Sequence, residues 1–380
     1  MNKKLKLKYT IGIILILCVI VISVLIVNFF EVKDDDAVKG SLVIWVESDT
    51  YDYMKKTADD FMELNGKADI KIVQAGEDEV EAAISTNNMP DIAQLSSSKV
   101  RDLRQKYNNI SLNIYENLIS SFSKNYTKSR LNEITDDNGL LGIPITSRPL
   151  VLYLREDMLE SYGYTYSQIN TWDDLISIGK DIKEKSGGKV SILNAVNQDY
   201  KDLKSLLIMQ AMEESSNEED VKMHINNSMA QLTDSGILNK NKNGEFLARI
   251  SSINDMFELS NIEQECIWVA CNVPAKYNGS NRFYNDEGDN FVILKNYDKN
   301  NKLIKKFFDY VSNNNKVREE YILNGTFFSS FVSSYNNKSI EAKINNFAYT
   351  SPLIVMNNIA NKSPSISDYE LYFKIKTDYE

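Results

Sequence analysis

Residues 40–49 read Gly-Ser-Leu-Val-Ile-Trp-Val-Glu-Ser-Asp, and this stretch decides the fold. The uninterrupted apolar run at residues 42–46 is typical of a strand that is buried on both faces of a parallel sheet. After it, Met54, Ala58 and Phe61 recur at the spacing of one helix face. The sequence therefore predicts a strand, a polar loop and a helix in succession.

The same unit repeats along the next fifty residues. Residues 70–74 have the pattern of a strand, 78–85 that of a helix, and 91–95 that of another strand after Pro90. This alternation predicts the α/β class, with a mostly parallel sheet flanked by helices. Such sheets bind ligands at the carboxyl ends of their strands, so the loops after the first and third strands are candidate walls of a binding site.

A second α/β unit follows. Residues 150–153 have the pattern of a strand, and 155–162 that of a short helix that Gly163 ends. Residues 171–174, Thr-Trp-Asp-Asp, form a capping-box start to a longer helix. Farther on, residues 303–311 place apolar side chains on one helix face. The chain is thus expected to contain two domains with separate cores.

The composition is that of a globular protein with an acidic surface. The 380 residues are 43% hydrophobic, and the formal net charge is -10. This charge disfavours nucleic acid as a partner, because nucleic acids are bound by clustered Lys and Arg. A neutral or cationic ligand is easier to accommodate.

The N-terminal region has the pattern of a membrane anchor. Residues 1–8 are a basic tail that is expected to stay cytoplasmic, residues 9–30 are an uncharged apolar run, and residues 31–40 are an acidic linker. About 20 apolar residues suffice to span a bilayer, so we expect one transmembrane helix with the bulk of the chain outside the cell. The alternatives are a cleaved signal peptide and a lipoprotein modified at Cys18.

Several stretches resemble, in order and spacing, the extracellular solute-binding proteins of family 1, the maltose-binding-protein-like receptors of ABC importers. At the start these are residues 40–49, the helix that carries Phe61, the strand at 70–73 and Met89-Pro-Asp-Ile92. The later stretches are residues 142–144 with 152–153, 157–159, 171–175, and 291–295 followed by 303–311. The resemblance extends over residues 40–330.

This resemblance implies a two-lobed clamp that closes on a small molecule and delivers it to the permease subunits of an ABC importer. Lobe 1 would comprise residues 41–145 and 282–330, and lobe 2 residues 146–281 and 331–380. The hinge would lie near Pro144, near residues 273–282 and near Phe331. The alternative is a protein of the same fold that senses a ligand and signals to a membrane partner without transport.

Candidate ligand residues come from the loops that follow the strands of both lobes. Asp49 falls where the family has an acidic contact, whereas Leu95 and Ser98 replace the family's aromatic and acidic sugar contacts after the third strand. Amides and carboxylates bind sugar hydroxyls, and aromatic rings stack on sugar faces, although a Trp within an apolar strand is more often a core residue. The predicted ligand-binding residues are Trp45, Glu47, Ser48, Asp49, Ser98, Ser147, Arg148, Asn197, Asp199, Tyr200, Trp268 and Tyr284.

Catalytic patterns are weak. The single His224 lies in a polar segment without a patterned nucleophile, and the spacing of zinc ligands is absent. The segment Ser186-Gly-Gly-Lys189 lacks the first Gly and the final Ser or Thr of a phosphate-binding loop. We therefore predict a carbohydrate-binding protein without catalytic residues, metal or cofactor.

Overall fold

The computed structural model describes residues 38–107, 123–137, 139–241, 245–295 and 301–379. The predicted basic tail (1–8), the predicted anchor (9–30) and most of the predicted linker (31–40) lie outside these residues. Within the described part of the chain, no helix is long and apolar enough to cross a membrane.

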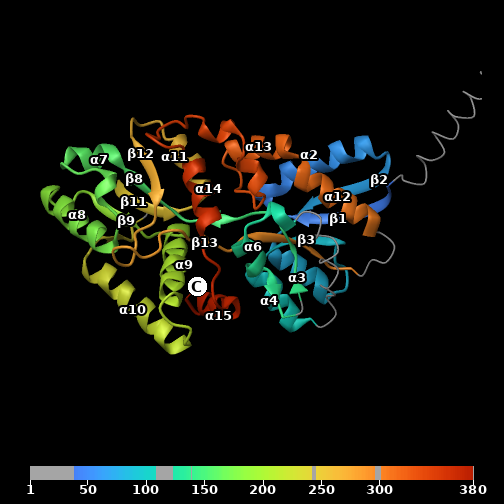
Figure 1. Cartoon of the computed structure of the whole chain (residues 1–380), viewed down its shortest axis with the longest axis horizontal. Helices are drawn as coiled ribbons and strands as arrows, with labels where there is room; N and C mark the ends of the chain where they lie inside the picture. The colour runs from blue at the N-terminus through green and yellow to red at the C-terminus, as the bar shows by residue number, and fades with distance from the viewer. Residues whose placement is uncertain (1–37, 108–122, 138, 242–244, 296–300, 380) are drawn as a thin grey trace, which may run out of the picture.

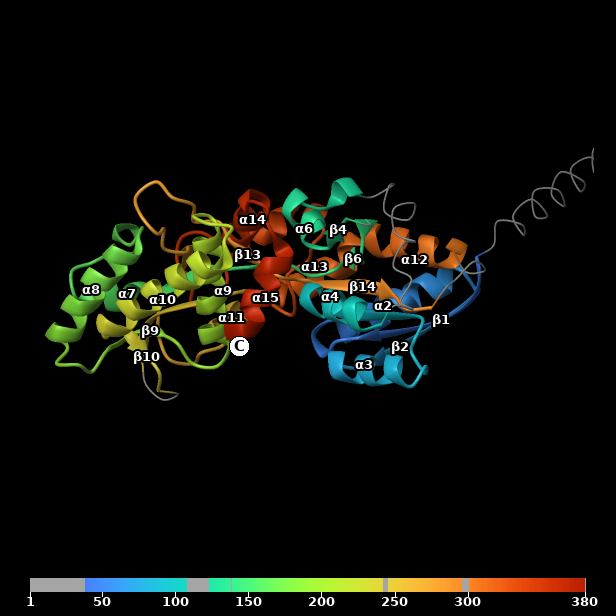
Figure 2. The same ribbon diagram turned by 90° about the horizontal axis from the view of Figure 1, so that it is seen from below.

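Two five-stranded sheets lie at opposite ends of the molecule (Figures 1 and 2). The first has the order β2 (Lys67–Gln74), β1 (Lys39–Val46), β3 (Ile92–Ser96), β14 (Asp289–Ile293) and β6 (Ile143–Pro144). The second has the order β10 (Leu238–Asn239), β9 (Ser191–Asn194), β11 (Phe246–Ser251), β8 (Val151–Arg155) and β12 (Trp268–Asn272). The protein is thus α/β with two lobes, as predicted.

Each sheet is mixed rather than mostly parallel as predicted, with two parallel and two antiparallel pairings among the described strands. β1 pairs in parallel with β2 and β3, whereas β14 is antiparallel to both β3 and β6. In the second sheet, β9 is parallel to β10 and β11, and β8 is antiparallel to both β11 and β12. The antiparallel strands of each sheet adjoin the segments where the chain passes between the lobes.

Helices cover the sheets of both lobes. Around the first sheet are α2 (Ser48–Leu64), α3 (Glu77–Ser85), α4 (Ser97–Lys106), α6 (Lys128–Glu133) and α12 (Asn301–Asn313). Around the second are α7 (Glu156–Ser161), α8 (Trp172–Lys185), α9 (Gln198–Met212), α10 (Glu218–Asp234), α11 (Ile253–Ser260) and α14 (Pro352–Lys362). Toward the middle of the molecule lie α13 (Asn315–Leu323) and α15 (Tyr369–Tyr379).

Three local predictions have clear outcomes in the structure. The expected helix after the first strand is present, and Met54, Ala58 and Phe61 are buried on its inner face. The strand itself, however, is not buried on both faces, because burial alternates along β1 and Trp45 on the second face is only half-buried. The predicted capping box is confirmed, since Asp174 N donates to Thr171 Oγ1 at 3.2 Å and Thr171 N donates to Asp174 Oδ2 at 2.8 Å.

The lobes have separate hydrophobic cores. Ile44, Phe61, Ile92 and Phe307 belong to the core of the first lobe. Alternate residues of β8 face two further cores, with Leu152 and Leu154 in one and Val151 and Tyr153 in the other. The second sheet is therefore covered by apolar side chains on both faces. Residues of α14 belong to one of these two cores, so the chain returns to the second lobe after α13.

Three segments pass between the lobes and lie side by side. β7 (Arg148–Pro149) pairs with β13 (Asn285–Asp286), and Thr146 forms a bridge with Ser329. Ser330 N donates to Ile145 O at 2.9 Å, which adds a backbone hydrogen bond between the first and third segments. The second segment passes between the lobes through β13 and β14, somewhat later in the chain than the predicted residues 273–282. The loop after β12 folds back on itself, since Arg282 Nε donates to Val273 O at 2.9 Å.

Candidate functional site

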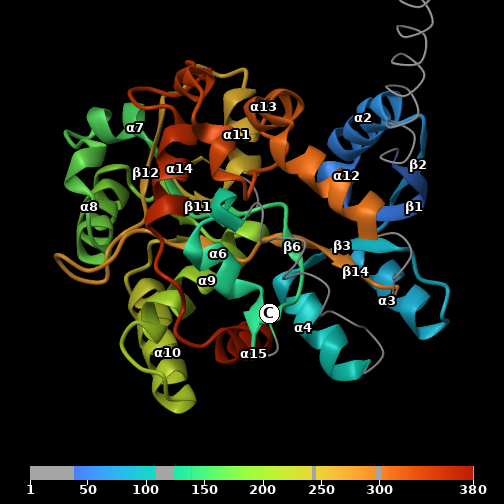
Figure 3. The same cartoon turned by 45° about the vertical axis from the view of Figure 1, so that its right-hand side comes forward.

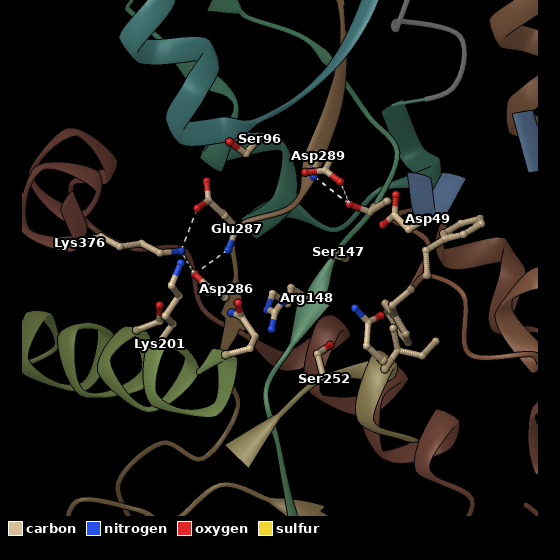
Figure 4. Close-up of a pocket in the computed structure, with 17 residues that line it drawn as sticks. Asp49, Ser96, Ser147, Arg148, Lys201, Ser252, Asp286, Glu287, Asp289 and Lys376 are labelled. Carbon is tan, nitrogen blue, oxygen red and sulfur yellow. Dashed lines mark hydrogen bonds and ion pairs between the residues drawn. The ribbon is translucent and has the colours of Figure 1, made fainter. Parts of the chain in front are cut away.

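A cavity of about 250 Å³ lies where the strand ends of both lobes meet the crossing segments (Figure 4). It is lined by Asp49 and Ser96 of the first lobe and by Gln198, Lys201, Ser205, Ser252, Ile253 and Asn254 of the second. The crossing segments and their neighbours add Thr146, Ser147, Arg148, Asp286, Glu287, Asp289, Phe327 and Phe328, and α15 adds Lys376. Residues far apart in the sequence thus converge on one polar space.

The first-lobe wall is acidic. Asp49 lies in the first turn of α2, directly after β1, and Asp289 opens β14 two strands away. Gln94 of β3 holds Asp289 in place, because its Nε2 donates to Asp289 Oδ2 at 2.9 Å. Thr146 Oγ1 donates to the same oxygen at 3.1 Å. By contrast, Asp49 Oδ1 is buried without a hydrogen-bond partner among the described residues.

Burial and mutual repulsion shift the titration of these carboxyl groups. Desolvation, followed by the nearby charges of Asp289 and Glu47, raises the pKa of Asp49 to about 7. Desolvation and the charges of Asp289 and Glu77 raise the pKa of Glu47 to about 7. Burial also raises the pKa values of Glu77 and Asp289. Near pH 7, Glu47 and Asp49 are therefore only partly ionised, because burial and the neighbouring carboxylates disfavour their negative charge.

The second-lobe wall has a different character, because its main charges are paired. Arg148 Nη2 contacts both carboxylate oxygens of Asp202, at 2.8 and 2.7 Å. Gln198 Nε2 donates to Asp202 Oδ1 at 2.8 Å, so Gln198 is held at the same site. Ser252 is only 4% exposed, and its Oγ has no hydrogen-bond partner among the described residues. This wall offers amide and hydroxyl groups, together with the exposed Lys201, for which no ion pair is present among the described residues.

The C-terminal helix neutralises one edge of the cavity. Lys376 Nζ of α15 lies 2.9 Å from Asp286 Oδ1 and 2.8 Å from Glu287 Oε1. Figure 3 shows α15 between α10 of the second lobe and α4 of the first. Arg101 of α4 forms an ion pair with Glu370 of α15, so this helix contacts both lobes beside the crossing segments.

A buried clamp on α6 fixes two of the crossing segments. The side chain of Arg130 is 1% exposed, and its Nε donates to Thr146 O at 3.0 Å and its Nη2 to Asp289 O at 2.8 Å. Its Nη1 lies 3.0 Å from Glu133 Oε1, which in turn accepts a hydrogen bond from Gly288 N at 3.0 Å. Gly288 is required here, because a Cβ would lie 2.1 Å from Thr146 O.

Three of the predicted ligand residues line the cavity, namely Asp49, Ser147 and Arg148. Glu47 lies close enough to Asp49 for their charges to interact, although it is not part of the lining. Ser98 lies near the rim, and its backbone N donates to Glu287 Oε2 at 3.0 Å. Direct contact of these residues with a ligand stays a prediction.

The other predicted residues do not line the cavity. Trp268 and Tyr284 are 2% and 3% exposed and belong to the cores of the second lobe, because apolar strands bury their large rings. Asp199 pairs with Arg249 at 2.9 Å inside the second lobe. Four more lie elsewhere: Trp45 is half-buried against the first core, Tyr200 is half-buried against the second, and Ser48 and Asn197 are exposed.

Several lining residues were not predicted from the sequence. The acidic turn Asp286-Glu287-Gly288-Asp289 lies just before the apolar residues 291–294 and could have been recognised as a cluster at the start of a strand. Gln198 lies next to the predicted residue Asn197, at the start of α9. Phe327 and Lys376 carried no such signal, because their proximity to the cavity depends on how distant segments pack.

Aromatic stacking is not available in the cavity of this structure. Its two aromatic lining residues, Phe327 and Phe328, are 2% and 1% exposed. Phe328 stacks instead on Tyr335, with ring centroids 4.4 Å apart. Within the described residues, no group of three or more His, Cys, Asp or Glu could hold a metal ion. The arrangement is suited to binding a polar solute through hydrogen bonds and charge.

Comparison with known proteins places this chain in a family. Residues 45–315 match the sequence profile of the bacterial extracellular solute-binding proteins. The lactose-binding protein of Rhizobium radiobacter is 25% identical over 170 residues, which cover 42% of this chain and 40% of that protein.

The fold is shared with solved sugar-binding proteins. The sugar-binding protein MalE from Xanthomonas citri superposes with a TM-score of 0.69 at 13% identity, covering 89% of this chain and 90% of that chain. The cyclic alpha-maltosyl-1,6-maltose binding protein from Arthrobacter globiformis gives a TM-score of 0.70 at 14% identity, covering 89% and 91%. The chain belongs to the bacterial extracellular solute-binding proteins.

Proposed function

We propose that this protein captures a small carbohydrate between its two lobes and delivers it to the permease subunits of an ABC importer. The observation that carries this proposal is the cavity at the lobe junction, which both lobes and the crossing segments line. A ligand in this position contacts both lobes at once, so its binding energy favours the closed arrangement.

The chemistry of the lining supports a hydroxyl-rich ligand. Carboxylates at Asp49 and Asp289, the amide of Gln198 and the hydroxyls of Ser147 and Ser252 can accept or donate hydrogen bonds. The similarity to the lactose-binding protein of Rhizobium radiobacter also supports a sugar ligand. Sugar hydroxyls require many polar contacts of this kind.

The proposed division into lobes follows the chain as the family resemblance implies. Residues 41–145 and 282–330 would move as one body, and residues 146–281 and 331–380 as the other. The three crossing segments would act as the hinge, since a few residues can absorb the rotation. The separate hydrophobic cores support this division for residues 41–145 and 146–281, whereas Tyr284, Ile322 and Phe328 pack into the cores of the second lobe.

We further propose that residues 9–30 anchor the protein in the membrane with the lobes outside the cell. The length and apolar character of this run support the proposal. Mass spectrometry of membrane-extracted protein should find the intact N-terminal segment. A new N-terminus between residues 32 and 40, or a lipid on Cys18, would contradict it.

Binding can be tested with a protein that comprises residues 38–380, without the N-terminal apolar segment. A thermal-shift screen against monosaccharides, disaccharides, amino acids and polyamines should give a rise in melting temperature with at least one sugar, followed by calorimetry. The variant Ser147→Ala should weaken that binding, whereas Asp69→Asn, on the exposed side of β2, should leave it unchanged. If amino acids bind and every sugar fails, the carbohydrate proposal is wrong.

A further inference from the structure

The acidic wall indicates more about the ligand than its hydroxyl content. We propose that the solute carries a protonated amine, so that the cavity takes an amino sugar with its ammonium group against Asp49 and Asp289. This inference rests on the proposed function of the same cavity and specifies its substrate class.

The first support is a contrast between two sets of carboxylates around the cavity. Asp286 and Glu287 are paired with Lys376, and Asp202 is paired with Arg148. The carboxylates of the other set form no ion pair with Lys or Arg among the described residues, and they are Glu47, Asp49, Glu77 and Asp289. The protein thus pairs the carboxylates on one side of the cavity with cationic side chains and leaves those on the other side without such a partner.

The second support is the geometry of the unpaired set. Asp49 and Asp289 both line the cavity, and Figure 4 shows the two carboxylates on the same side of it, away from Lys201 and Lys376. Asp49 Oδ1 is buried and lacks a hydrogen-bond donor among the described residues. A buried carboxylate oxygen without a donor is costly, and an ammonium group supplies both the donor and the opposite charge.

A structural explanation accounts for only part of this arrangement. Asp49 and Glu77 lie in the first turns of α2 and α3, where the helix dipole favours a negative side chain. Asp289, however, opens a strand, and the pKa of Asp49 is raised to about 7 in spite of its helix position. The helix ends therefore do not neutralise the wall, and a bound cation would.

The opposite wall explains why an amino sugar fits better than a simple polyamine. Gln198, Ser205, Ser252 and Asn254 present amide and hydroxyl groups, which match the hydroxyls of a sugar. A polyamine would leave these groups without partners when the lobes close. The amine would therefore face the first lobe, and the hydroxyls the second.

The test compares matched pairs of probes by calorimetry at pH 7. The pairs are glucosamine with glucose and galactosamine with galactose, and spermidine serves as a cation without hydroxyls. The amine member of at least one pair should bind roughly ten- to a hundredfold more tightly than its neutral partner. Asp49→Asn should abolish this preference, whereas the exposed-site control Asp69→Asn should keep it.

The pH dependence of amine binding gives an independent test of the inference. The charged groups near Asp49 are Glu47, Glu77 and Asp289 on its own lobe, Arg130 behind them, and Lys201 across the cavity. Because carboxyl groups with a pKa of about 7 are partly protonated at pH 6, an ammonium must displace protons as it binds. Amine affinity should fall between pH 7 and pH 5, and the heat should depend on the buffer.

The outcomes separate this inference from the proposed function. Preference for the amine member, with proton release, supports both. Equal or tighter binding of a neutral sugar overturns the amine inference and leaves sugar binding intact. Binding of spermidine alone, or of none of the probes at millimolar concentration, overturns the amino-sugar assignment.

Discussion

At the scale of single residues, the ionised carboxylates of the acidic wall reduce the folding stability of the ligand-free protein. A carboxyl group whose pKa is raised on folding favours the folded state most when it is protonated. For Asp49 this stabilisation is complete below its ordinary pKa of 3.8 and is lost as the pH rises through about 7. The same holds for Glu47 relative to its ordinary value of 4.5. The ligand-free protein should therefore lose stability between pH 5 and pH 8.

The variant Asp49→Asn tests whether the negative charge of Asp49 destabilises the ligand-free protein. It removes a charge that burial and two neighbouring carboxylates disfavour, so the melting temperature of the empty variant should exceed that of the unmodified protein at pH 8. At pH 5 the two should differ much less. Differential scanning fluorimetry without ligand measures both values, and Asp69→Asn serves as the control. A lower melting temperature at both pH values would make Asp49 a structural residue.

Gly288 lies where two of the crossing segments approach each other closely. Gly288→Ala places a methyl group against Thr146 O and the Arg130 side chain, so the backbone must shift. Overpacking of this kind typically costs about 1–3 kcal/mol in the free energy of unfolding. Urea denaturation should show this loss, whereas Gly66→Ala, which meets no atom within 4 Å, should leave stability nearly unchanged.

At the scale of elements, the short helix α6 joins the crossing segments to the first lobe. Its two buried charged residues, Arg130 and Glu133, bond to each other and to the segments around Thr146 and Gly288. Burial raises the pKa of Glu133 to about 7, against the opposing effect of the Arg130 charge. The crossing segments are thus held by a polar clamp rather than by apolar packing alone.

The variant Arg130→Ala tests how much this clamp contributes to the free energy of unfolding. Removing one partner of a buried ion pair commonly costs about 3–5 kcal/mol, because the other charge stays buried without compensation. The free energy of unfolding should therefore fall by an amount of this order in urea denaturation. Lys128→Ala, at an exposed position of the same helix, is the matched control and should change it by less than about 0.5 kcal/mol. Equal effects of the two variants would argue against a clamp.

At the scale of the whole molecule, the proposed clamp mechanism has the two lobes rotate about the three crossing segments while their cores stay intact. A ligand that bridges both walls should favour the closed arrangement. Ligand at one hundred times its dissociation constant should also raise the free energy of unfolding by about 2.7 kcal/mol. Small-angle scattering of the protein with a bound sugar should show a smaller radius of gyration. Tight binding without compaction would contradict the clamp mechanism.

The sequence by itself determined the first three strands of the first lobe, the two helices between them and the class of the fold. The apolar run of β1, the helical spacing of Met54, Ala58 and Phe61, and the breaker Pro90 are local signals, and the structure has each element in the expected place. The position of Asp49 at the cavity was also predictable, since it follows directly from the end of a strand.

Only the tertiary structure decided which other side chains meet Asp49. Trp268 and Tyr284 have the chemistry of ligand platforms, yet the packing of the second lobe buries both rings. Asp289 and Lys376 reach the cavity because a crossing strand and the C-terminal helix return to it from distant parts of the chain. Periodicity and capping depend on neighbours within a few residues, whereas a site between two lobes depends on contacts between segments hundreds of residues apart.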